Sequence, residues 1–409
     1  MVYKIMENED FFKENIFYSV TGRVFAILLA IFSSCFLFVS LIFPSFKDTE
    51  SDYDGCADGY YYTYTEDGSG VVLRECRERD GGIIKLPSYI RGKIVVGLRL
   101  RCNYDAEITS VIIPETVLRL EYIDINIRGD SFRNLIIPSS VEYVQRLMLD
   151  YYPRTIYVEK GAKTANWDKD WSRGNDEIEE GGIYPRYHHV VYIQDYGMTD
   201  NGLLWVELEN GEISIVSVES GVSNISIPNM VNGKKVTSIA PFAFYNQGEV
   251  NSISIPDSVK SIGEYVFEGC SFSTRVKENL KYAGDKANPY MYLHGANTYY
   301  YADTDGDGVE TYFPNTSAII DEKCKIIGEE AFKNWDKLTT VIIPKSVIYI
   351  SNYIFAGCDS LYSIKYNGTI SEWENVNKEA DWYKKSYSEL FPDNIKTVIC
   401  SDGEITITD

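Results

Sequence analysis

The stretch from Cys324 to Ile343, CKIIGEEAFKNWDKLTTVII, recurs in the same phase from Val347 to Tyr366, VIYISNYIFAGCDSLYSIKY. The two stretches match at apolar positions that are each displaced by 23 residues, namely Ile327/Ile350, Ala331/Ile354, Phe332/Phe355, Leu338/Leu361 and Val341/Ile364. Leucine-rich repeats have periods of about 20–29 residues. The sequence therefore predicts a solenoid in which each copy is one coil and the matched side chains stack from coil to coil.

The same repeat occurs in two earlier parts of the chain. The offset of 23 relates Val236, Ile239, Ala243 and Phe244 to Val259, Ile262, Val266 and Phe267. An offset of 24 relates Ile113-Pro114, Val117 and Leu120 to Ile137-Pro138, Val141 and Val144. The earliest block departs from the others, since Ile123-Asp-Ile125 and Leu147-Met-Leu149 stand where the others have Gly-x-x-Ala/Val-Phe.

Each unit predicts a short strand, a proline that ends it, a second extended piece and one helical turn ending in Phe. The expected strands are residues 108–113, 132–137, 222–227, 250–255, 338–343 and 361–366. We expect Phe244 to stack on Phe267, and Phe332 on Phe355. The predicted fold class is thus a leucine-rich-repeat solenoid, a curved parallel sheet with short helical turns, preceded by one transmembrane helix.

Two segments, SIPDSVKSIGEYVFEGC (254–270) and VIIPKSVIYISNYIFAGCDSL (341–361), closely resemble the BspA-like subfamily of leucine-rich repeats. NLKYAGDKANPY (279–290) is similar to an insertion of that family, and IKYNGTISEWENV (364–376) looks like its closing segment. The resemblance extends over residues 57–409. It implies a surface protein with a binding or adhesion role, and it brings no catalytic motif with it.

The N-terminal part contains an uncharged run, VFAILLAIFSSCFLFVSLIF, from Val24 to Phe43. Twenty helical residues span about 30 Å, the thickness of a bilayer core. Lys4, Lys13 and Arg23 precede the run, so the positive-inside rule predicts a cytoplasmic N-terminus and an extracellular C-terminal part. A cleaved signal peptide is the alternative.

Together these patterns predict the following organisation: 1–23 cytoplasmic stub; 24–44 transmembrane signal-anchor helix; 45–158 lead-in strands and first repeat block; 159–227 connector and second lead-in; 228–276 second repeat block; 277–318 tyrosine-rich insertion; 319–366 third repeat block; 367–409 C-terminal cap.

The composition of the chain limits the classes of partner that it could bind. The net charge of −21 disfavours nucleic acid as a partner, because binding phosphates requires a basic face. Hydrophobic residues at 44% indicate a chain that folds, and 33 tyrosines suit strands and binding surfaces alike.

Candidate chemical sites are few. Asp303, Asp305 and Asp307 begin like a calcium-binding EF-hand loop, but Pro314 stands where the bidentate Glu is needed, so a polar turn and weak calcium binding both remain open. Adjacent histidines in a strand point to opposite faces, which argues against a metal site at His188-His189. That leaves His294 as the third histidine, and no nucleophile elbow accompanies it.

The spacing of the cysteines predicts neither a disulfide framework nor a cofactor site. Cys35 lies in the apolar run, while Cys56, Cys76 and Cys102 allow a disulfide whose pairing cannot be read from the sequence. Cys270 and Cys358 each follow a Phe-x-Gly element, where a small apolar residue at a turn is a better interpretation than a reactive thiol.

Two surfaces compete as the binding surface. The insertion between Val276 and Ile319 breaks the repeat phase and carries Tyr282, Tyr290, Tyr292, Tyr299, Tyr300, Tyr301 and Tyr312. Strand alternation predicts that the outward residues are Ser110, Ile112, Asn134, Ile136, Asn224, Ser226, Ser252, Ser254, Thr340, Ile342, Ser363 and Lys365.

This outward set is small and lacks aromatic residues, so the insertion is favoured for recognition, although its tyrosines could equally pack onto the solenoid. The sequence thus predicts a non-catalytic cell-surface protein that binds a protein or glycan ligand. The alternative is an envelope scaffold that binds partners on its own cell.

Overall fold

The structure is a computed structural model that describes residues 53–77, 82–102, 108–125, 132–149, 155–172, 188–302, 311–385 and 395–407. The chain divides into two compact units, Met1–Asp54 and Gly55–Asp409, and every described strand and helix belongs to the second. The predicted stub and transmembrane helix lie outside the described residues. Within those residues, no helix is both long and apolar enough to cross a bilayer.

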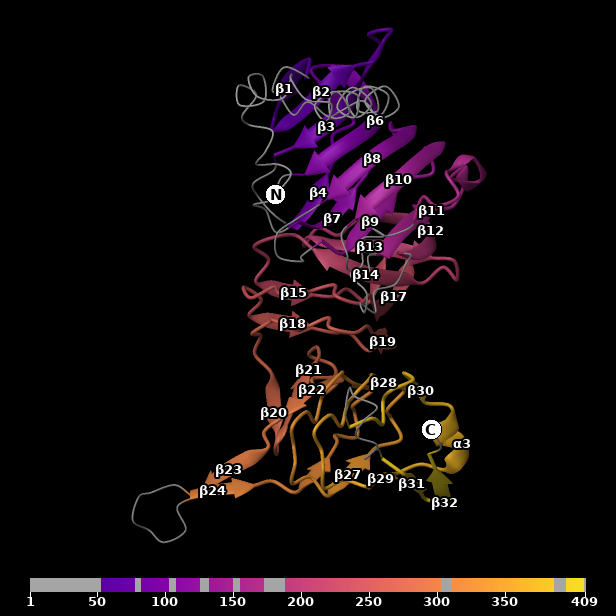
Figure 1. Ribbon diagram of the computed structural model, residues 1–409. Coiled ribbons are helices and arrows are strands. Elements are labelled where there is room, and N and C mark those ends of the chain that lie inside the picture. The colour runs from indigo at the N-terminus through magenta and orange to yellow at the C-terminus, as the bar shows by residue number, and fades with distance from the viewer. Residues whose placement is uncertain are drawn as a thin grey trace, which may run out of the picture. The chain divides into compact units, whose positions relative to one another are not determined.

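The first repeat block consists of coils whose chain passes alternately through two sheets (Figure 1). One sheet contains β1 (Gly55–Ala57), β2 (Tyr60–Tyr64), β3 (Gly70–Cys76), β5 (Tyr89–Ile90), β6 (Lys93–Cys102), β8 (Arg119–Ile125) and β10 (Tyr143–Leu149). The opposite sheet begins with β4 (Gly82–Lys85), β7 (Ile108–Ile112), β9 (Asn134–Ile137) and β11 (Thr155–Glu159). The segments that lack the Gly-x-x-Ala/Val-Phe element are therefore full strands, β8 and β10, which pair in parallel.

The second of these sheets continues beyond the block. It adds β12 (His189–Met198), β13 (Leu203–Leu208), β14 (Ile213–Val218), β16 (Met230–Val231), β17 (Lys234–Ile239) and β19 (Ser261–Ile262). Strands β12, β13 and β14 form an antiparallel meander, after which β14, β17 and β19 pair in parallel again. A separate parallel pair, β15 (Asn224–Ser226) and β18 (Ser252–Ser254), completes the second block.

The third block has its own pair of sheets. One contains β20 (Arg275–Lys277), β21 (Leu280–Ala283), β22 (Tyr292–Ala296), β26 (Ile326–Ile327), β28 (Tyr349–Ile350) and β30 (Asn377–Lys378). The other contains β25 (Ser317–Ile319), β27 (Thr340–Ile343), β29 (Ser363–Tyr366), β31 (Thr397–Cys400) and β32 (Gly403–Thr406). Strands β23 (Tyr299–Ala302) and β24 (Thr311–Pro314) form a hairpin.

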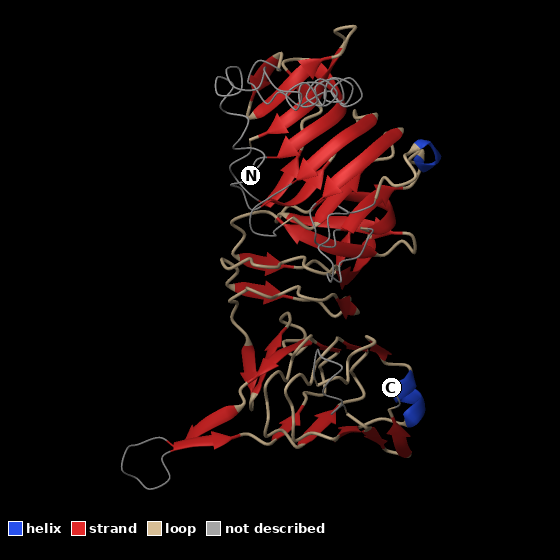
Figure 2. Ribbon diagram, in the orientation of Figure 1, coloured by secondary structure: helices blue, strands red, loops and turns tan. Residues whose placement is uncertain are grey.

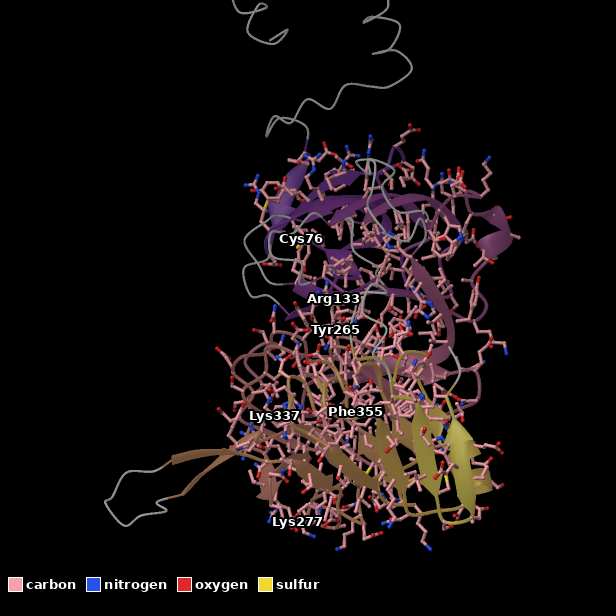
Figure 3. The ribbon with its side chains drawn as sticks, turned by 60° about the horizontal axis from the view of Figure 1, so that its bottom comes forward. Cys76, Arg133, Tyr265, Lys277, Lys337 and Phe355 are labelled. Carbon is pink, nitrogen blue, oxygen red and sulfur yellow. The ribbon has the colours of Figure 1, made fainter. Side chains whose placement is uncertain are left out.

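The predicted strands and phenylalanine stacks are confirmed. Each predicted range contains a shorter observed strand, and the ring centroids lie 5.8 Å apart for Phe244/Phe267 and 5.4 Å apart for Phe332/Phe355. Phe355 is fully buried inside the coils, whereas Lys277 and Lys337 lie at their exterior (Figure 3).

The predicted helical turns are wrong. Only α3 (Ile370–Glu374) and the 3₁₀ turn η2 (Thr164–Asn166) are helical among the described residues (Figure 2). The residue before Ala/Val/Ile-Phe has a positive φ in all four copies, at Phe242, Tyr265, Glu330 and Tyr353. A left-handed residue at that position stops a right-handed helix before its first turn, so the element is a run of tight turns.

The outward placement of three first-block residues is also wrong. Ser110, Asn134 and Ile136 are buried, with at most 2% of their surface exposed. The β13–β14 hairpin covers their face of the sheet, and Val216 packs there with Ile136 in a second apolar core. Asn134 Nδ2 donates hydrogen bonds to Val216 O at 3.0 Å and to Ser110 Oγ at 3.2 Å, so its buried amide is satisfied.

The last coil is covered by residues from the predicted cap. Strand β31 adds in parallel to β29, and β32 turns back antiparallel at the edge. Trp382 continues the aromatic stack 6.5 Å from Phe355, and Trp373 packs edge-on against Tyr366 at 5.0 Å. A capping box formed by Thr369 and Glu372 begins α3.

A candidate binding site at the joint between repeat blocks

Both hydrogen-bonded ladders are interrupted where the second block meets the insertion. We call the side of the coils that holds β15, β18 and β25 the strand side, and the side that holds β19 and β22 the turn side. On the strand side, β18 pairs with β15, while the next coils begin a separate sheet at β25. On the turn side, β19 ends one sheet, and β20 to β22 begin another. The last coil of the second block, residues 250–272, meets residues 275–335 at this level of the stack. We call this level the joint.

The turn side shows the interruption atom by atom. In a regular coil the left-handed residue donates its backbone N–H to a carbonyl of the following coil. Phe242 donates to Glu264 O at 3.0 Å, and Tyr353 donates to Asp381 O at 3.2 Å. At the joint the N–H of Tyr265 instead donates to the carboxylate Oε2 of Glu329 at 2.7 Å. A side chain has thus replaced the missing backbone acceptor.

The insertion causes the interruption because its coil lacks the turn element. Tyr292 from β22 takes the next place in the aromatic stack, 5.3 Å from Phe267. The tyrosine ring lies over Gly328, where an added Cβ would meet the tyrosine hydroxyl at 2.3 Å, so this position requires glycine. The space that a regular turn would fill stays open.

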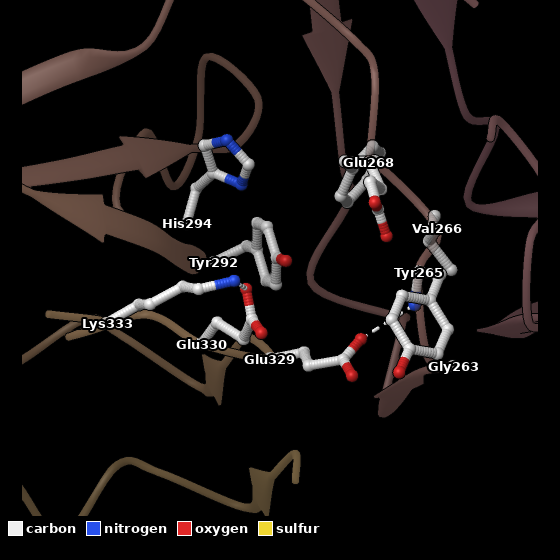
Figure 4. Close-up of a pocket in the computed structure, with 10 residues that line it drawn as sticks. Gly263, Tyr265, Val266, Glu268, Tyr292, His294, Glu329, Glu330 and Lys333 are labelled. Atoms are coloured by element: carbon white, nitrogen blue, oxygen red, sulfur yellow. Dashed lines mark hydrogen bonds and ion pairs between the residues drawn. The ribbon is translucent and has the colours of Figure 1, made fainter. Parts of the chain in front are cut away.

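That space is a pocket of about 300 Å³, which we call the turn pocket (Figure 4). Its lining residues are Gly263, Tyr265, Val266, Phe267, Glu268, Tyr292, His294, Glu329, Glu330 and Lys333. Glu268 lies exposed at the mouth and Glu329 is half-buried. Lys333 Nζ pairs with Glu330 Oε2 at 2.6 Å, which neutralises that carboxylate.

The electrostatics of the turn pocket are unusual at Glu329. Burial raises the pKa of its carboxyl to about 7, the N–H of Tyr265 opposes the shift, and the nearby carboxylates Glu264, Glu330 and Glu268 add to it. Burial also lowers the pKa of His294 to about 4, and Lys281 acts in the same direction. His294 is therefore neutral near pH 7, and Glu329 carries a partial negative charge with a high desolvation cost.

A second, larger pocket of about 850 Å³ opens on the strand side of the joint. Residues from β18, including Ile253 and Ser254, line one wall, and Arg275 of β20 with Tyr282 and Lys286 from the insertion line the other. Polar side chains also bridge the joint: Asn288 Nδ2 donates to Asp257 Oδ1 at 2.8 Å.

The tyrosines of the insertion divide into two groups. Tyr282 and Tyr292 are buried. Tyr282 accepts the N–H of Asp321 at 3.0 Å and packs in the core of the third block, whereas Tyr292 packs against Phe267 of the second block. Tyr290 is partly buried and meets Tyr282 edge-on at 5.4 Å. Packing is therefore the correct interpretation for this group.

The remaining tyrosines belong to the β23–β24 hairpin, which extends away from the coils (Figure 1). Tyr299 is 39% exposed. Tyr300 and Tyr301 continue β23, and Tyr312 lies on β24 opposite Tyr301. Among the described strands, β23 and β24 pair only with each other.

Other candidate residues have structural roles or lie outside the description. His188 is buried and its strand neighbour His189 is exposed, as alternation predicts. The thiol of Cys270 lies 3.0 Å from Phe244 O and that of Cys358 lies 3.1 Å from Phe332 O. Burial raises the pKa of Cys270 to about 11 and that of Cys358 to about 12, so neither is a ready nucleophile.

Asp303, Asp305 and Asp307 lie outside the described residues. Cys76 and Cys102 are register partners on β3 and β6, and Cys56 is exposed on β1. Across the described part of the chain, no three histidine, cysteine or acidic side chains gather to hold a metal ion.

The sequence interpretation missed the turn pocket. Tyr265 lines one wall of the pocket and Glu329 lines the other, 64 positions later in the chain. Their positions within their repeat units are nearly the same, since Tyr265 precedes its phenylalanine by two residues and Glu329 precedes its phenylalanine by three. The available signal was the loss of repeat phase between Val276 and Ile319, which indicates that two turns face each other across an irregular coil.

Comparison with known proteins identifies the family to which the repeat belongs. Six copies of the BspA type leucine-rich repeat region match the chain, over residues 215–290 and 311–378. These ranges include the second and third blocks. No curated protein is similar enough to count as a match.

Several solved structures are similar to the chain. A leucine-rich cell surface protein from Faecalibacterium prausnitzii has 17% identity, a TM-score of 0.25, and a match to 80% of this chain and 98% of its own. A leucine-rich repeat protein from T. pallidum has 20% identity, a TM-score of 0.24, and coverage of 42% and 81%. One from Bacteroides ovatus has 16% identity, a TM-score of 0.24, and coverage of 77% and 76%.

Proposed function

We propose that this chain, which belongs to the BspA-type leucine-rich-repeat proteins, is a non-catalytic cell-surface protein that binds a protein or glycan ligand. Repeat solenoids offer extended surfaces of this kind, and their function is commonly recognition. The protein would be held at the membrane by residues 24–44, with residues 45–409 outside the cell.

The observation that carries the proposal is the β23–β24 hairpin. It interrupts the repeat, adds no strand to the coil sheets as described, and presents Tyr299 to solvent. Tyrosine is enriched at binding hot spots because it buries a large rigid area and retains a polar tip. Because neither described strand of the hairpin joins a coil sheet, recognition is the best explanation for it.

The test uses the full-length chain against matrix proteins, a glycan panel and extract of its own envelope. Changing Tyr299, Tyr300 and Tyr301 together to Ser should abolish capture and leave the melting temperature unchanged. Tyr89→Ser is the matched control, since Tyr89 is 61% exposed on β5 and lies outside the insertion.

A second variant removes the hairpin itself. Asn315 N–H donates to Thr298 O at 2.9 Å, so the ends of the hairpin are already adjacent, and residues 299–314 can be replaced by an Asn-Gly turn. Full binding by this variant, with loss after changing Ser252, Ser254 and Ile342 to Glu, would place recognition on the strands instead. Capture of envelope partners alone would favour the scaffold role.

A further inference from the structure

The turn pocket contains a hydroxyl group that the fold leaves unused. Tyr292 is 4% exposed, and its hydroxyl has no hydrogen-bond partner among the described residues. Figure 4 shows this hydroxyl directed into the pocket, toward the side that holds Glu268 and Glu329. The hydroxyl oxygen itself is not one of the fully buried atoms without a partner, so water in the pocket can reach it. A ligand that displaces this water and supplies a hydrogen bond would keep the hydroxyl satisfied.

The pocket also contains a carboxylate without a compensating charge. The charges that act on Glu329 are Glu264, Glu268 and Glu330, all of one sign, and Lys333 is engaged with Glu330. His294 stays neutral because of its burial. A cation entering the pocket would offset the desolvation cost that Glu329 bears.

The walls suit a cation that is attached to an apolar stem. Tyr265, Phe267 and Tyr292 supply aromatic rings, and Val266 adds aliphatic surface. Aromatic faces attract ammonium and guanidinium groups, most strongly where water is excluded. An anion would meet three carboxylates at this site, and a neutral group would leave Glu329 uncompensated.

We propose that the turn pocket binds the alkylammonium or guanidinium end of a lysine or arginine side chain presented by the ligand. The charged head would donate hydrogen bonds to Glu329 and to the hydroxyl oxygen of Tyr292, and the stem would lie against Phe267 and Val266. This inference rests on the proposed function, because it assumes a protein ligand.

The primary test measures the pocket without that ligand. The full-length chain is titrated by saturation-transfer NMR with n-butylammonium and n-butylguanidinium, and with 1-butanol as the neutral isostere. Glu329→Gln removes the charge and keeps an acceptor for the N–H of Tyr265, while Tyr292→Phe removes only the hydroxyl. Glu249→Gln is the control, since Glu249 is an exposed acid outside the pocket.

We expect the cations to bind the wild type and Glu249→Gln equally, and to bind Glu329→Gln and Tyr292→Phe each about tenfold less tightly, the change expected for one hydrogen bond that involves a charged group. Cation affinity should also fall as the pH is lowered through 7, because Glu329 must be ionised to bind. Equal binding of 1-butanol, or unchanged cation binding to Glu329→Gln, would overturn the assignment.

A second arm identifies the source of the cation. Once a protein ligand has been captured, excess n-butylguanidinium should compete with it, and Glu329→Gln should weaken its binding at least tenfold. If the ligand binds both pocket variants normally while the small cations do not, the pocket takes a free amine and the side-chain assignment is wrong. Failure to capture any ligand counts against the proposed function alone, since the small-cation titration does not depend on it.

Discussion

Single residues with positive φ determine the path of each coil. After the left-handed residue before Ala/Val/Ile-Phe, a second one follows Phe by two positions, as Asn246, Gly269, Asn334 and Gly357. These positions stack in pairs, because an added Cβ on Gly357 would lie 2.7 Å from Oδ1 of Asn334. Glycine therefore alternates with asparagine for two reasons. Both residues tolerate a positive φ, and glycine leaves room for the asparagine side chain of the preceding coil.

These two reasons can be separated by substitution. Gly357→Ala should lower the free energy of unfolding by about 1–2 kcal/mol because of the positive φ alone, and by more because of the contact with Asn334. Gly211→Ala is the matched control, since Gly211 has φ 78° and nothing within 4 Å of an added Cβ. Chemical denaturation should show a larger loss at Gly357. Equal losses would mean that the Asn334 contact relaxes at no cost.

Glu329 makes stability depend on pH. Its pKa is raised to about 7 from an ordinary value of 4.5, so the folded state holds this proton more tightly than the unfolded state. Its contribution to stability is therefore largest below pH 4.5 and is lost as the pH rises toward 7. Glu329→Gln should gain melting temperature relative to wild type as the pH is raised from 5 to 8. The same comparison with Glu249→Gln should give no such trend, and a trend there would assign the effect to general surface charge.

At the scale of elements, strands were predictable and turns were not. Apolar residues two positions apart identify β27 and β29 from local sequence alone, and Pro344 marks the end of β27. The segment Gly328–Phe332 has the composition of a helical turn, and the backbone of Glu330 decides otherwise through contacts with the next coil. Burial of Asn134 depends on Val216, 82 positions away, which alternation within β9 cannot report.

The same local reasoning could not locate the turn pocket. Its residues are ordinary members of two repeat units, and only the irregular coil between them, with Tyr292 over Gly328, opens the space.

The cap makes a prediction at the same scale. Truncation after Tyr366 would remove β31 and Trp382, exposing the edge of β29 and the ring of Phe355. Exposed edges and apolar faces promote association, so the truncated chain should aggregate. Light scattering after size exclusion provides the measurement. A monomeric product that still melts cooperatively would show that residues 367–409 are dispensable for closure.

At the scale of the whole described unit, the joint divides the stack. Coils of a repeat protein are coupled mainly through their nearest-neighbour interfaces. Within the blocks these interfaces include continuous backbone ladders, whereas side chains such as Glu329 and Asn288 bridge the joint. The unfolding of the two sides should therefore be separable.

Calorimetry tests this division. Phe355→Ala should cost about 3–5 kcal/mol, the range for removing a buried phenylalanine, and should lower only the transition of the third block. Phe244→Ala, in the second block, should lower only the other transition. One transition that both substitutions shift equally would show that the joint couples as strongly as a regular interface.

The joint also has a mechanical consequence. A force applied between the first block and the β23–β24 hairpin is transmitted along the stack and crosses this level. Inside a block, rows of backbone hydrogen bonds share the load, whereas at the joint the bond of Tyr265 to Glu329 and that of Asn288 to Asp257 carry a large part of it. Under tension the stack should part there first, lengthening the protein while the coils on either side keep their shape.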